Sequence, residues 1–338
     1  MGQPIRIGIA GHGNLGRGVE AALVHNPDMQ LVGIYTRRPP ADIRPLRADT
    51  PVHAMTALAG HTDRIDVLIL CGGSKEDLPE QGPTLAAAFN TVDSFDTHAR
   101  IPEYFAAVDA PARAAGKTAL ISAGWDPGMF SINRVVGEAL LPDGDTYTFW
   151  GKGLSQGHSD AIRRVPGVAA GVQYTIPVDA AVDQVRSGQR PTLTTRQKHT
   201  RECFVVLQEG ADAETVRQAI VTMPHYFDDY DTTVEFVTAD TLRREHGAMP
   251  HGGFVIRSGN TGGGSTGAGN TGAGNTQLIE YGLKLASNPE FTASVLVACA
   301  RAVHRLHGTG RYGALTVFDV PPGLLSPKSA EQLRAELL

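Results

Sequence analysis

Cysteine is scarce in this chain: its 338 residues include three, Cys71, Cys203 and Cys299. The number is odd, the three lie far apart, and no pair has the Cys-x-x-Cys spacing. The sequence therefore predicts neither a disulfide framework nor a zinc site with thiolate ligands. The twelve histidines are scattered. His304 and His307 share a predicted helical face, but no acidic or cysteine ligand accompanies them, so we expect no metal site.

Long apolar runs are also absent. No run approaches the roughly 20 residues that a helix needs to span a bilayer. The first apolar segment begins within five residues of Met1, which leaves no room for a signal peptide. We therefore expect a cytoplasmic protein that has no membrane partner.

An excess of basic residues is missing as well. The formal net charge is −5, and aromatic residues make up 6% of the chain. No basic patch with interleaved aromatic residues occurs, which argues against a nucleic-acid partner. Apolar residues at 41% and charged residues at 19% are typical of a globular protein. The length predicts two domains.

A glycine-rich turn near the N-terminus is the first positive feature. The apolar run Ile5 to Ala10 leads into Gly11-His12-Gly13-Asn14-Leu15-Gly16, and after a helix-length segment comes a second apolar run, Leu31 to Tyr35. A GxGxxG turn between a predicted strand and a predicted helix is the dinucleotide-binding fingerprint. Its glycines permit the tight turn, the approach of the pyrophosphate and close packing of helix on strand. The pyrophosphate then binds at the helix N-terminus.

Two arginines follow the second predicted strand, where an NAD-binding domain carries an acidic residue. A carboxylate would repel a 2′-phosphate, whereas the guanidinium groups of Arg37 and Arg38 match one. The sequence therefore predicts NADP rather than NAD as the cofactor. The alternative is that both arginines are solvated loop residues.

Short apolar runs alternate with helical patterns through the first part of the chain, which predicts a doubly wound, parallel α/β sheet of the Rossmann type. Further strands are predicted at 66–71, 90–93 and 118–122, and helices at 83–89 and 101–115. Ligands bind outside the carboxyl ends of such strands. The cofactor-binding candidates are therefore the fingerprint and the segments that leave the strands: Gly11, His12, Gly13, Asn14, Leu15, Gly16, Thr36, Arg37, Arg38, Cys71, Gly72, Gly73, Ser74, Ser94, Phe95, Asp96, Ala123, Gly124, Trp125, Asp126 and Pro127.

The later segments predict a second domain of the α+β class with a mixed or antiparallel sheet. Strands are predicted at 147–150, 171–177, 196–207, 233–238, 253–258 and 277–285, and helices at 129–141, 179–187 and 213–223. We place the nucleotide domain at 1–124 and the second domain at 125–287. A helix at 291–306, a strand at 314–320 and a terminal helix would complete the first domain with residues 288–338. The low-complexity run 259–276 predicts a mobile surface loop.

Both tryptophans lie in two unusual segments, Gly124 to Ser131 and Phe149 to Asp160. Trp125 and Trp150 each stand beside glycine and polar residues, which is uncommon for a purely structural aromatic residue. The alternative is that the two rings anchor a domain junction. Taken singly, Asp96 and Asp126 are better explained as helix N-cap residues than as ligands of a substrate.

Taken together, these segments resemble the meso-diaminopimelate dehydrogenase family, the NADP-dependent enzymes of bacterial lysine biosynthesis. The resemblance rests on segments along nearly the whole chain: 13–16, 37–38, 91–96, 124–133, 149–160, 172–177, 201–206, 249–253 and 288–294. The Trp-Asp-Pro-Gly-Met-Phe-Ser and Leu-Ser-Gln-Gly-His-Ser-Asp strings are far more specific than the glycine turn. Two departures are His12, where the family often has Tyr, and the long run 259–276.

The resemblance implies a homodimer that oxidises meso-2,6-diaminoheptanedioate, a molecule with an ammonium and a carboxylate at each end. By family position, a first group of residues surrounds the reacting end: Asp96 and Asp126 hold the amino group, Trp125 and Trp150 enclose the aliphatic chain, and the backbone at Gln156 and Gly157 binds the carboxylate. A second group binds the distal end: Thr175, Arg201, His251 and Asn288. The implied reaction transfers a hydride to the nicotinamide and hydrolyses the resulting imine to release ammonia. No residue is identified as a general base.

Other interpretations remain beside this one. A dihydrodipicolinate-type reductase would carry a His-His-x-x-Lys stretch, which this chain lacks. An aspartate-type amino acid dehydrogenase stays open, and so does an NADP-sensing regulatory protein, although the latter would need a degraded second site. From pattern alone, Arg201 is better explained as a solvated residue of an edge strand, and His251 as a turn residue.

Overall fold

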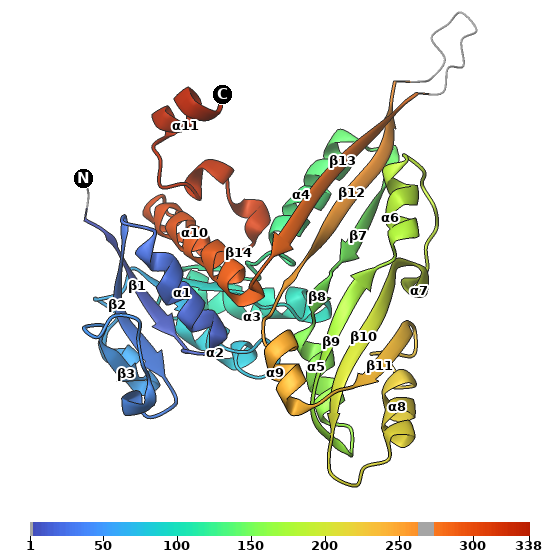
Figure 1. The fold of residues 1–338 in the computed structure, drawn as a ribbon. Helices are drawn as coiled ribbons and strands as arrows, with labels where there is room; N and C mark the ends of the chain where they lie inside the picture. Colours follow the sequence, from blue (N-terminus) through green and yellow to red (C-terminus); the bar gives the residue numbers. More distant parts are fainter. Residues whose placement is uncertain (1–2, 263–273) are drawn as a thin grey trace, which may run out of the picture. The chain divides into compact units, whose positions relative to one another are not determined.

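The computed structural model describes residues 3–262 and 274–338. The chain forms two compact units (Figure 1): unit 1 comprises Met1–Ile132 and Pro289–Leu338, and unit 2 comprises Asn133–Asn288. The predicted fold class is confirmed, because unit 1 is a doubly wound parallel α/β domain and unit 2 carries a mixed and an antiparallel sheet. No described helix is both long and apolar enough to cross a membrane.

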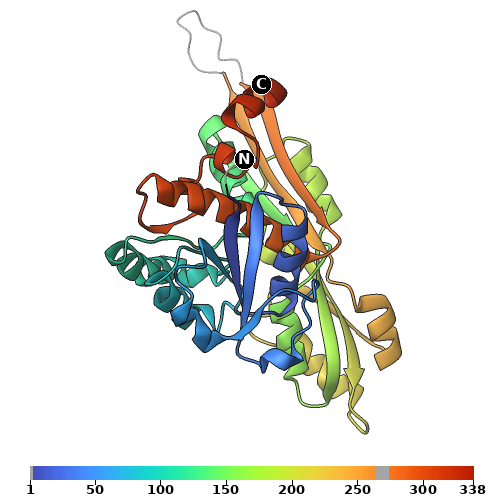
Figure 2. The same ribbon diagram turned by 90° about the vertical axis from the view of Figure 1, so that its left-hand side faces the viewer.

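A seven-stranded sheet forms the centre of unit 1. Its strands, in the order in which they lie, are β14 (Gly313–Leu315), β6 (Thr118–Leu120), β5 (Thr91–Asp93), β4 (Val67–Leu70), β1 (Ile5–Ala10), β2 (Met29–Thr36) and β3 (Val52–Ala54). All neighbouring strands are parallel, as Figure 2 shows for β1 and β2. The chain turns to opposite sides after β1 and after β3, so β1 lies at the point where ligands bind in sheets of this kind.

Helices cover both faces of this sheet because its strands are apolar on both sides. In β1, Ile7 and Ile9 are fully buried in the core beneath α1 (Asn14–Val24) and α10 (Asn288–Gly308). In β4, Leu68 and Leu70 are fully buried in the core beneath α2 (Leu78–Ala86) and α3 (Ile101–Ala114). Further helical segments of unit 1 are α11 (Ala330–Leu337) and the short 3-10 turns at Pro40–Asp42, Met55–Gly60, His98–Arg100, Val317–Asp319 and Pro322–Leu324.

A buried arginine attaches the C-terminal part of the chain to the start of β2. Arg301 on α10 is 1% exposed. Its Nε and Nη2 donate to the two carboxylate oxygens of Asp28 at 2.6 and 2.8 Å, and further bonds reach Asn26 and the carbonyl of Leu325. The guanidinium group lowers the pKa of Asp28. Every side of this buried charge therefore has a partner, which is the condition under which such a group is tolerated.

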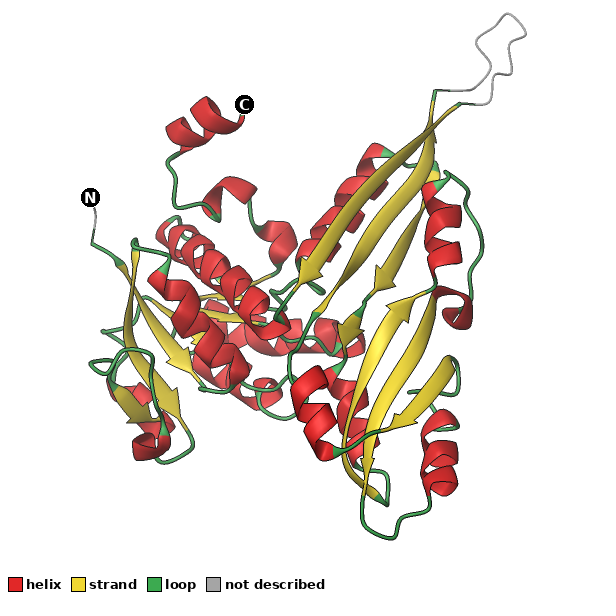
Figure 3. Ribbon diagram, viewed as in Figure 1, coloured by secondary structure: helices red, strands yellow, loops and turns green. Residues whose placement is uncertain are grey.

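Unit 2 contains two sheets (Figure 3). The mixed sheet has the order β11 (Asp231–Phe236), β10 (His199–Leu207), β9 (Val168–Pro177) and β8 (Gly153–Leu154). The antiparallel sheet has the order β13 (Asn275–Leu285), β12 (His251–Thr261) and β7 (Gly144–Trp150). The helices are α4 (Met129–Leu140), which begins in unit 1, α5 (Gln156–Arg163), α6 (Asp179–Arg186), α7 (Thr195–Lys198), α8 (Ala213–Val221) and α9 (Ala239–His246).

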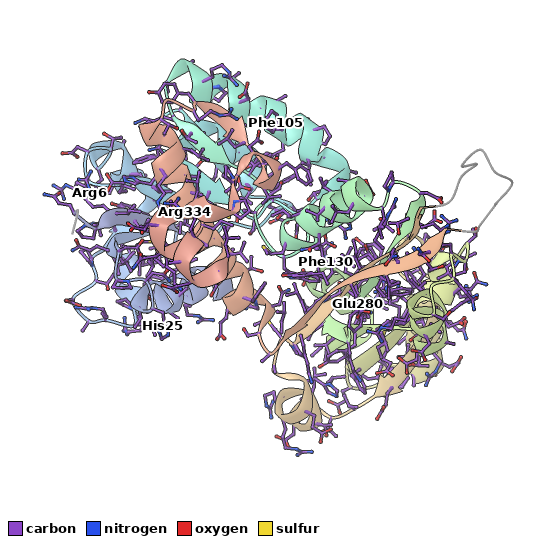
Figure 4. The ribbon with its side chains drawn as sticks, turned by 90° about the horizontal axis from the view of Figure 1, so that it is seen from above. Arg6, His25, Phe105, Phe130, Glu280 and Arg334 are labelled. Carbon is purple, nitrogen blue, oxygen red and sulfur yellow. The ribbon has the colours of Figure 1, made fainter. Side chains whose placement is uncertain are left out.

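Each sheet of unit 2 has its own apolar core. The mixed sheet buries Cys203, Val205 and Val234 against residues of α5 and α8. The antiparallel sheet buries Phe149 and Ile256 against α6. Arg186 of α6 also stacks on Phe254 and forms two hydrogen bonds to Glu280 of β13, which is labelled in Figure 4. Unit 2 therefore has two apolar cores, one for each sheet.

Several predicted element ends differ from the structure, such as the helix predicted at 83–89, which is Leu78–Ala86, and three of the errors have a clear cause. Residues 196–198 belong to α7 and not to a strand, because Thr194 and Gln197 form a capping box that starts a helix. The strand predicted at 314–320 ends at Leu315, because the Thr316 hydroxyl accepts a hydrogen bond from the Phe318 N–H and starts a helical turn. The loop predicted at 259–276 is too long, because β12 and β13 remain paired as far as Thr261 and Asn275. Its middle lies outside the described residues.

Candidate functional site

The dinucleotide turn of unit 1 depends on two glycines. Gly11 has a φ of 98° and donates its N–H to the Tyr35 carbonyl at 2.8 Å. A β-carbon on Gly16 would overlap the carbonyl oxygen of Gly11. Only glycine can therefore occupy position 16 while α1 lies this close to the end of β1. Leu15 packs against the core beneath α1.

The first turn of α1 is open to an anion. Gly13 occupies the N-cap position, no side chain caps the helix, and the first turn contains no acidic residue. A β-carbon on Gly13 would meet no atom within 4 Å, so this side of the turn is unobstructed. Backbone N–H groups and the helix dipole at such an N-terminus favour a phosphate group. The residues present thus fit a dinucleotide pyrophosphate.

Arg37 and Arg38 are both attached to neighbouring segments. Arg38 donates from Nη2 to the His12 carbonyl at 2.6 Å, and its backbone N–H bonds to the Thr36 hydroxyl at 3.1 Å. Arg37 forms an ion pair with Asp77 at 2.7 Å, and the other oxygen of that carboxylate accepts the Gly73 N–H at 2.9 Å. Both side chains thus start from the end of β2 and reach the segments that follow β1 and β4.

His12 is buried, in contrast to what its place in a turn suggests. Its Nε2 lies 2.9 Å from Oε2 of Glu20, and Oε1 of the same carboxylate accepts the Leu46 N–H at 2.7 Å. His12 therefore belongs to a local hydrogen-bond network. This network connects the fingerprint turn to the loop that follows Arg37 and Arg38.

The segments after β4 and β5 are joined by one serine. The Ser74 hydroxyl donates to the Ser94 carbonyl at 3.4 Å and accepts the Asp96 N–H at 3.1 Å. Asp96 itself is exposed, while Phe95 is buried and stacks on Tyr104 with the ring centroids 4.1 Å apart. The next helical turn begins at His98, so Asp96 is not its N-cap residue. Cys71 and Gly72, the first residues after β4, are half-buried.

A buried carboxylate lies behind these segments and was not among the predicted site residues. Asp93, the last residue of β5, accepts the N–H groups of Phe95 and Ser122 at 2.9 and 3.0 Å on one oxygen and the Tyr104 hydroxyl at 2.7 Å on the other. Burial raises the pKa of Asp93 and of Tyr104. The sequence signal that could have identified Asp93 is its place at the end of a predicted strand, in the run Thr-Val-Asp-Ser. That run does not show that the Asp93 side chain is buried.

Trp125 and Asp126 lie in the turn between β6 and α4. The Trp125 ring is 7% exposed and meets Phe130 edge to face at 5.2 Å. Asp126 and Pro127 are half-buried and are joined by a cis peptide bond. Helix α4 begins at Met129, so Asp126 is not its N-cap residue. Ala123 and Gly124 are buried directly before this turn.

Arg201 lies on β10, which has β11 and β9 on its two sides, so it does not lie on an edge strand. The interpretation of Arg201 as a solvated residue is therefore wrong. Its side chain is 6% exposed and lies over the Tyr230 ring, with Cζ 3.8 Å from the centroid. Arg201 and Thr175 are paired across β10 and β9, and Nη1 donates to the Thr175 hydroxyl. Nε is buried without a partner, and no carboxylate in the described part of the chain pairs with this guanidinium group.

Gln173 adds a second unpaired atom beside Arg201. It is fully buried two residues before Thr175, and its Nε2 donates to the Thr175 hydroxyl at 3.4 Å. Its Oε1 has no partner among the described residues. Buried polar atoms are almost always paired in a folded chain, so an unpaired donor on Arg201 and an unpaired acceptor on Gln173 mark a position for a polar ligand or water.

Two histidines, the buried His199 and the half-buried His158, adjoin the same cluster and remain neutral. His199 accepts the Trp150 N–H on Nε2 at 2.8 Å, and its ring stacks on the indole at 5.4 Å. Burial and the charge of Arg201 lower the pKa of His199 to about 3. His158 bonds to the Ser155 hydroxyl at 2.8 Å, and the same causes lower its pKa to about 4. Neither histidine was predicted as a site residue.

The remaining predicted residues of unit 2 lie at the ends of elements. Gln156 and the exposed Gly157 begin α5, whose N-cap Ser155 makes no capping bond and whose first turn has no acidic residue. His251 begins β12 and accepts the Gly252 N–H on Nδ1 at 2.8 Å. Asn288 begins α10, and its N–H donates to the Met249 carbonyl at 2.9 Å. The described residues contain no group of three or more side chains suited to hold a metal ion.

Comparison with known proteins decides the family. The family model described as "Diaminopimelic acid dehydrogenase C-terminal domain" matches residues 124–287. The meso-diaminopimelate D-dehydrogenases of Lysinibacillus sphaericus and Corynebacterium glutamicum are 60% and 47% identical to this chain, over 99% and 98% of each sequence. This chain belongs to the meso-diaminopimelate D-dehydrogenase family. The resemblance seen in the sequence is therefore confirmed.

Solved structures of this family agree over the whole chain. The C. glutamicum dehydrogenase in complex with DAP has a TM-score of 0.89 at 46% identity and covers 100% of both chains. An engineered D-amino acid dehydrogenase bound to NADP+ has a TM-score of 0.84 at 45% identity and covers 99% of this chain and 100% of its own. The dihydrodipicolinate-reductase interpretation is thus set aside in favour of the dehydrogenase family.

The two arginines after β2 lead to a prediction on cofactor preference. In a chain with Arg37→Met and Arg38→Met, we expect the ratio of kcat/KM for NADP+ to that for NAD+ to fall by about 100-fold or more, because two charged hydrogen bonds are lost and each contributes about 1.5–3 kcal/mol. Steady-state kinetics with both cofactors measure this ratio. Arg47→Met is the control, because Arg47 lies on the same loop and pairs with Asp49. An equal loss with NAD+ would contradict a role in 2′-phosphate binding.

Proposed function

We propose that this chain catalyses the reversible, NADP-dependent oxidative deamination of the D centre of meso-2,6-diaminoheptanedioate. The products are L-2-amino-6-oxoheptanedioate, which cyclises to tetrahydrodipicolinate, and ammonia, and the reaction belongs to lysine biosynthesis. The observation that carries this proposal is the buried, unneutralised guanidinium group of Arg201. A charge in that state calls for an anionic ligand, and a substrate carboxylate supplies one.

The nucleotide half of the proposal rests on the fit of unit 1 to NADP. The open first turn of α1 would bind the pyrophosphate, and Arg37 and Arg38 would face the 2′-phosphate. Asp77 keeps Arg37 directed toward the segment after β4 until the phosphate competes for it. When bound, NADP+ supplies the hydride acceptor. The segments after β4, β5 and β6 would surround the nicotinamide, as the strand-end rule predicts.

The reacting end of the substrate needs partners for an amine and a carboxylate. We assign the amine to Asp96 and Asp126, both of which leave carboxyl ends of unit 1 strands. We assign the carboxylate to the backbone N–H groups at Gln156 and Gly157, because the N-terminus of α5 has no side-chain cap or acidic residue. Trp125 and Trp150 would enclose the aliphatic chain and exclude water from the path of the hydride.

The distal end would be held by Thr175, Arg201, His251 and Asn288. The Thr175 hydroxyl already accepts from Arg201 and from Gln173, so its own proton is directed to a third acceptor, which a carboxylate provides. Arg201 can donate from Nε to the same group. An amino acid dehydrogenase for simpler substrates would not need this cluster to bind a distal carboxylate. A regulatory protein that binds NADP would need the residues assigned to neither end of the substrate.

These assignments determine which ligand each domain would bind. We propose that 1–124, completed by about 288–338, binds NADP, and that 125–287 binds the substrate and forms the dimer.

The decisive experiment for the function is NADP+ reduction, followed by absorbance, with meso-, LL- and DD-diaminopimelate and with several simple D-amino acids. We expect reduction with the meso form and little with the LL form. Equal activity on simple D-amino acids would favour a general amino acid dehydrogenase.

Replacing Arg201 tests the distal site. Arg201→Met fills a similar volume without a charge, so we expect unchanged or higher thermal stability, because burial of the unpaired charge is costly. We expect kcat/KM for meso-diaminopimelate to fall by about 100-fold or more, since at least one charged hydrogen bond is lost, with NADPH affinity unchanged. Arg217→Met is the matched control, because Arg217 also lies over an aromatic ring, that of Phe236. A parallel loss of NADPH binding would show that Arg201 does not act on the substrate.

The pH dependence should follow the substrate amine. The hydride can leave only when the adjacent nitrogen has a free lone pair, so we expect oxidative activity to rise from about pH 6 to about pH 10 as ammonium loses its proton. His158 and His199 do not contribute to this rise, because their lowered pKa values of about 4 and about 3 keep both neutral over the range. The rate of NADP+ reduction at saturating substrate checks this, and a flat profile would contradict it.

We also propose that the active form is a homodimer. Helix α4 exposes three apolar side chains of unit 2: Val135 at 48%, Val136 at 45% and Leu140 at 62%. Such a stripe on a surface helix is typical of an interface. Leu140→Asp should therefore shift the mass measured by size exclusion with light scattering from dimer to monomer, whereas Val24→Asp, on the exposed side of α1, should leave it unchanged. A dimer that persists in Leu140→Asp would exclude this surface.

The compartment we propose is the cytoplasm. All three cysteines are free thiols in the structure, and a reducing compartment maintains that state. Cell fractionation with immunodetection measures the location directly, and recovery from an oxidising compartment would contradict it.

A further inference from the structure

Asp93 is the most extensively hydrogen-bonded buried carboxylate of unit 1. It is 1% exposed at the end of β5. Oδ1 accepts the N–H groups of Phe95 and Ser122 at 2.9 and 3.0 Å, and Oδ2 accepts the Tyr104 hydroxyl at 2.7 Å. Its backbone carbonyl accepts the Ala123 N–H at 2.8 Å. One residue thus binds the turn after its own strand, the segment after β6, and helix α3.

The two segments that Asp93 joins carry the residues assigned to the reacting amine. Phe95 directly precedes Asp96, and Ser122 and Ala123 lead into Trp125 and Asp126. Strands β5 and β6 pair at Thr91–Ala119 and Val92–Leu120. Asp96 and Asp126 lie beyond these pairs, so the strand pairing does not reach them. Beyond these pairs, Asp93 joins the two segments, because its Oδ1 accepts an N–H group from each of them and its carbonyl accepts the Ala123 N–H.

The backbone conformation of Ser122 indicates that the surroundings fix the position of the segment after β6. It has a φ of 56°, in the left-handed region that residues with a side chain rarely adopt. Its hydroxyl is buried and has no hydrogen-bond partner in the part of the chain that the structure describes. A residue in this conformation persists when its surroundings over-determine it. Here the Asp93 oxygen takes the Ser122 N–H, and the chain then turns toward Gly124 and Trp125.

We propose that Asp93 is a positioning residue of the reaction, which sets the distance between the Asp96 and Asp126 segments and so the place of the reacting amine beside the nicotinamide. The proposal rests on the substrate contacts assigned to Asp96 and Asp126 above. Asp93 touches neither substrate nor cofactor in this role. It acts through the two backbone N–H groups that share its Oδ1.

Two substitutions at position 93 separate geometry from charge. Asp93→Asn keeps an oxygen for both N–H groups and presents an amide N–H to the Tyr104 oxygen, so we expect near wild-type kinetics. Asp93→Ala leaves both N–H groups without an acceptor. For this variant we expect kcat/KM for meso-diaminopimelate to fall about 10- to 100-fold, the loss expected from a misplacement of about 1 Å, with NADPH affinity changed by less than about threefold.

The primary deuterium isotope effect provides the readout that a purely structural role would not change. With substrate deuterated at the D carbon, we expect a larger effect on kcat/KM in Asp93→Ala than in the wild type, because hydride transfer from a misplaced amine becomes more rate-limiting. A loss of folded protein lowers the rate but leaves the isotope effect as it was. If Asp93→Ala is recovered unfolded, Asp93→Ser, with room for a water, takes its place in the same measurement.

Tyr104→Phe is the matched control. It removes the hydrogen bond to Oδ2, keeps the stacking on Phe95, and leaves both bonds to Oδ1 in place. We expect a lower melting temperature with unchanged kcat, KM and isotope effect. The proposal is overturned if Asp93→Ala behaves like Tyr104→Phe, or if Asp93→Asn is as defective as Asp93→Ala. A wild-type chain that does not oxidise meso-diaminopimelate would instead overturn the proposed function.

Discussion

All seven strands of unit 1 run in one direction, and this constraint determines where chemistry can occur in that unit. Parallel strands bring their carboxyl ends to one edge of the sheet, so segments that are up to about a hundred residues apart in the chain lie next to one another there. The glycine turn, the two arginines and the turns after β4, β5 and β6 all start from that edge. Hydrogen bonds between them, from Arg38 to His12 and from Asp96 to Ser74, then hold the segments together.

The buried polar groups of the two units include contrasting cases, some fully paired and some with an unpaired atom. Arg301 has a partner at every nitrogen, and the oxygens of Asp93 are likewise occupied. Arg201 and Gln173 are equally buried but each keeps an atom without a partner. A fully paired group stabilises the fold, whereas an unpaired one destabilises it until a ligand completes the set. Such a local cost to stability is common at binding sites.

Much of this organisation could be predicted from the sequence. The fingerprint, the arginine pair and the alternating runs depend on local spacing and on apolar periodicity, which a linear sequence displays. Short elements were missed because two or three residues carry too little pattern: β3 and β8 are examples. Errors at the ends of longer elements came from side-chain hydrogen bonds, as at Thr194 and Thr316, and from backbone pairing, which extends β12 and β13 into glycine-rich sequence.

The sequence by itself determined the family, the cofactor class and the two-part architecture, because these depend on motifs whose residues are contiguous or regularly spaced. It also identified Arg201 and Thr175 by family position. Only the tertiary structure decided that Arg201 is buried with no carboxylate partner among the described residues, that His158 and His199 are neutral beside it, and that Asp93 connects two segments of the sheet edge. Burial and pairing depend on residues brought together from distant parts of the chain, and no local pattern records which residues these will be.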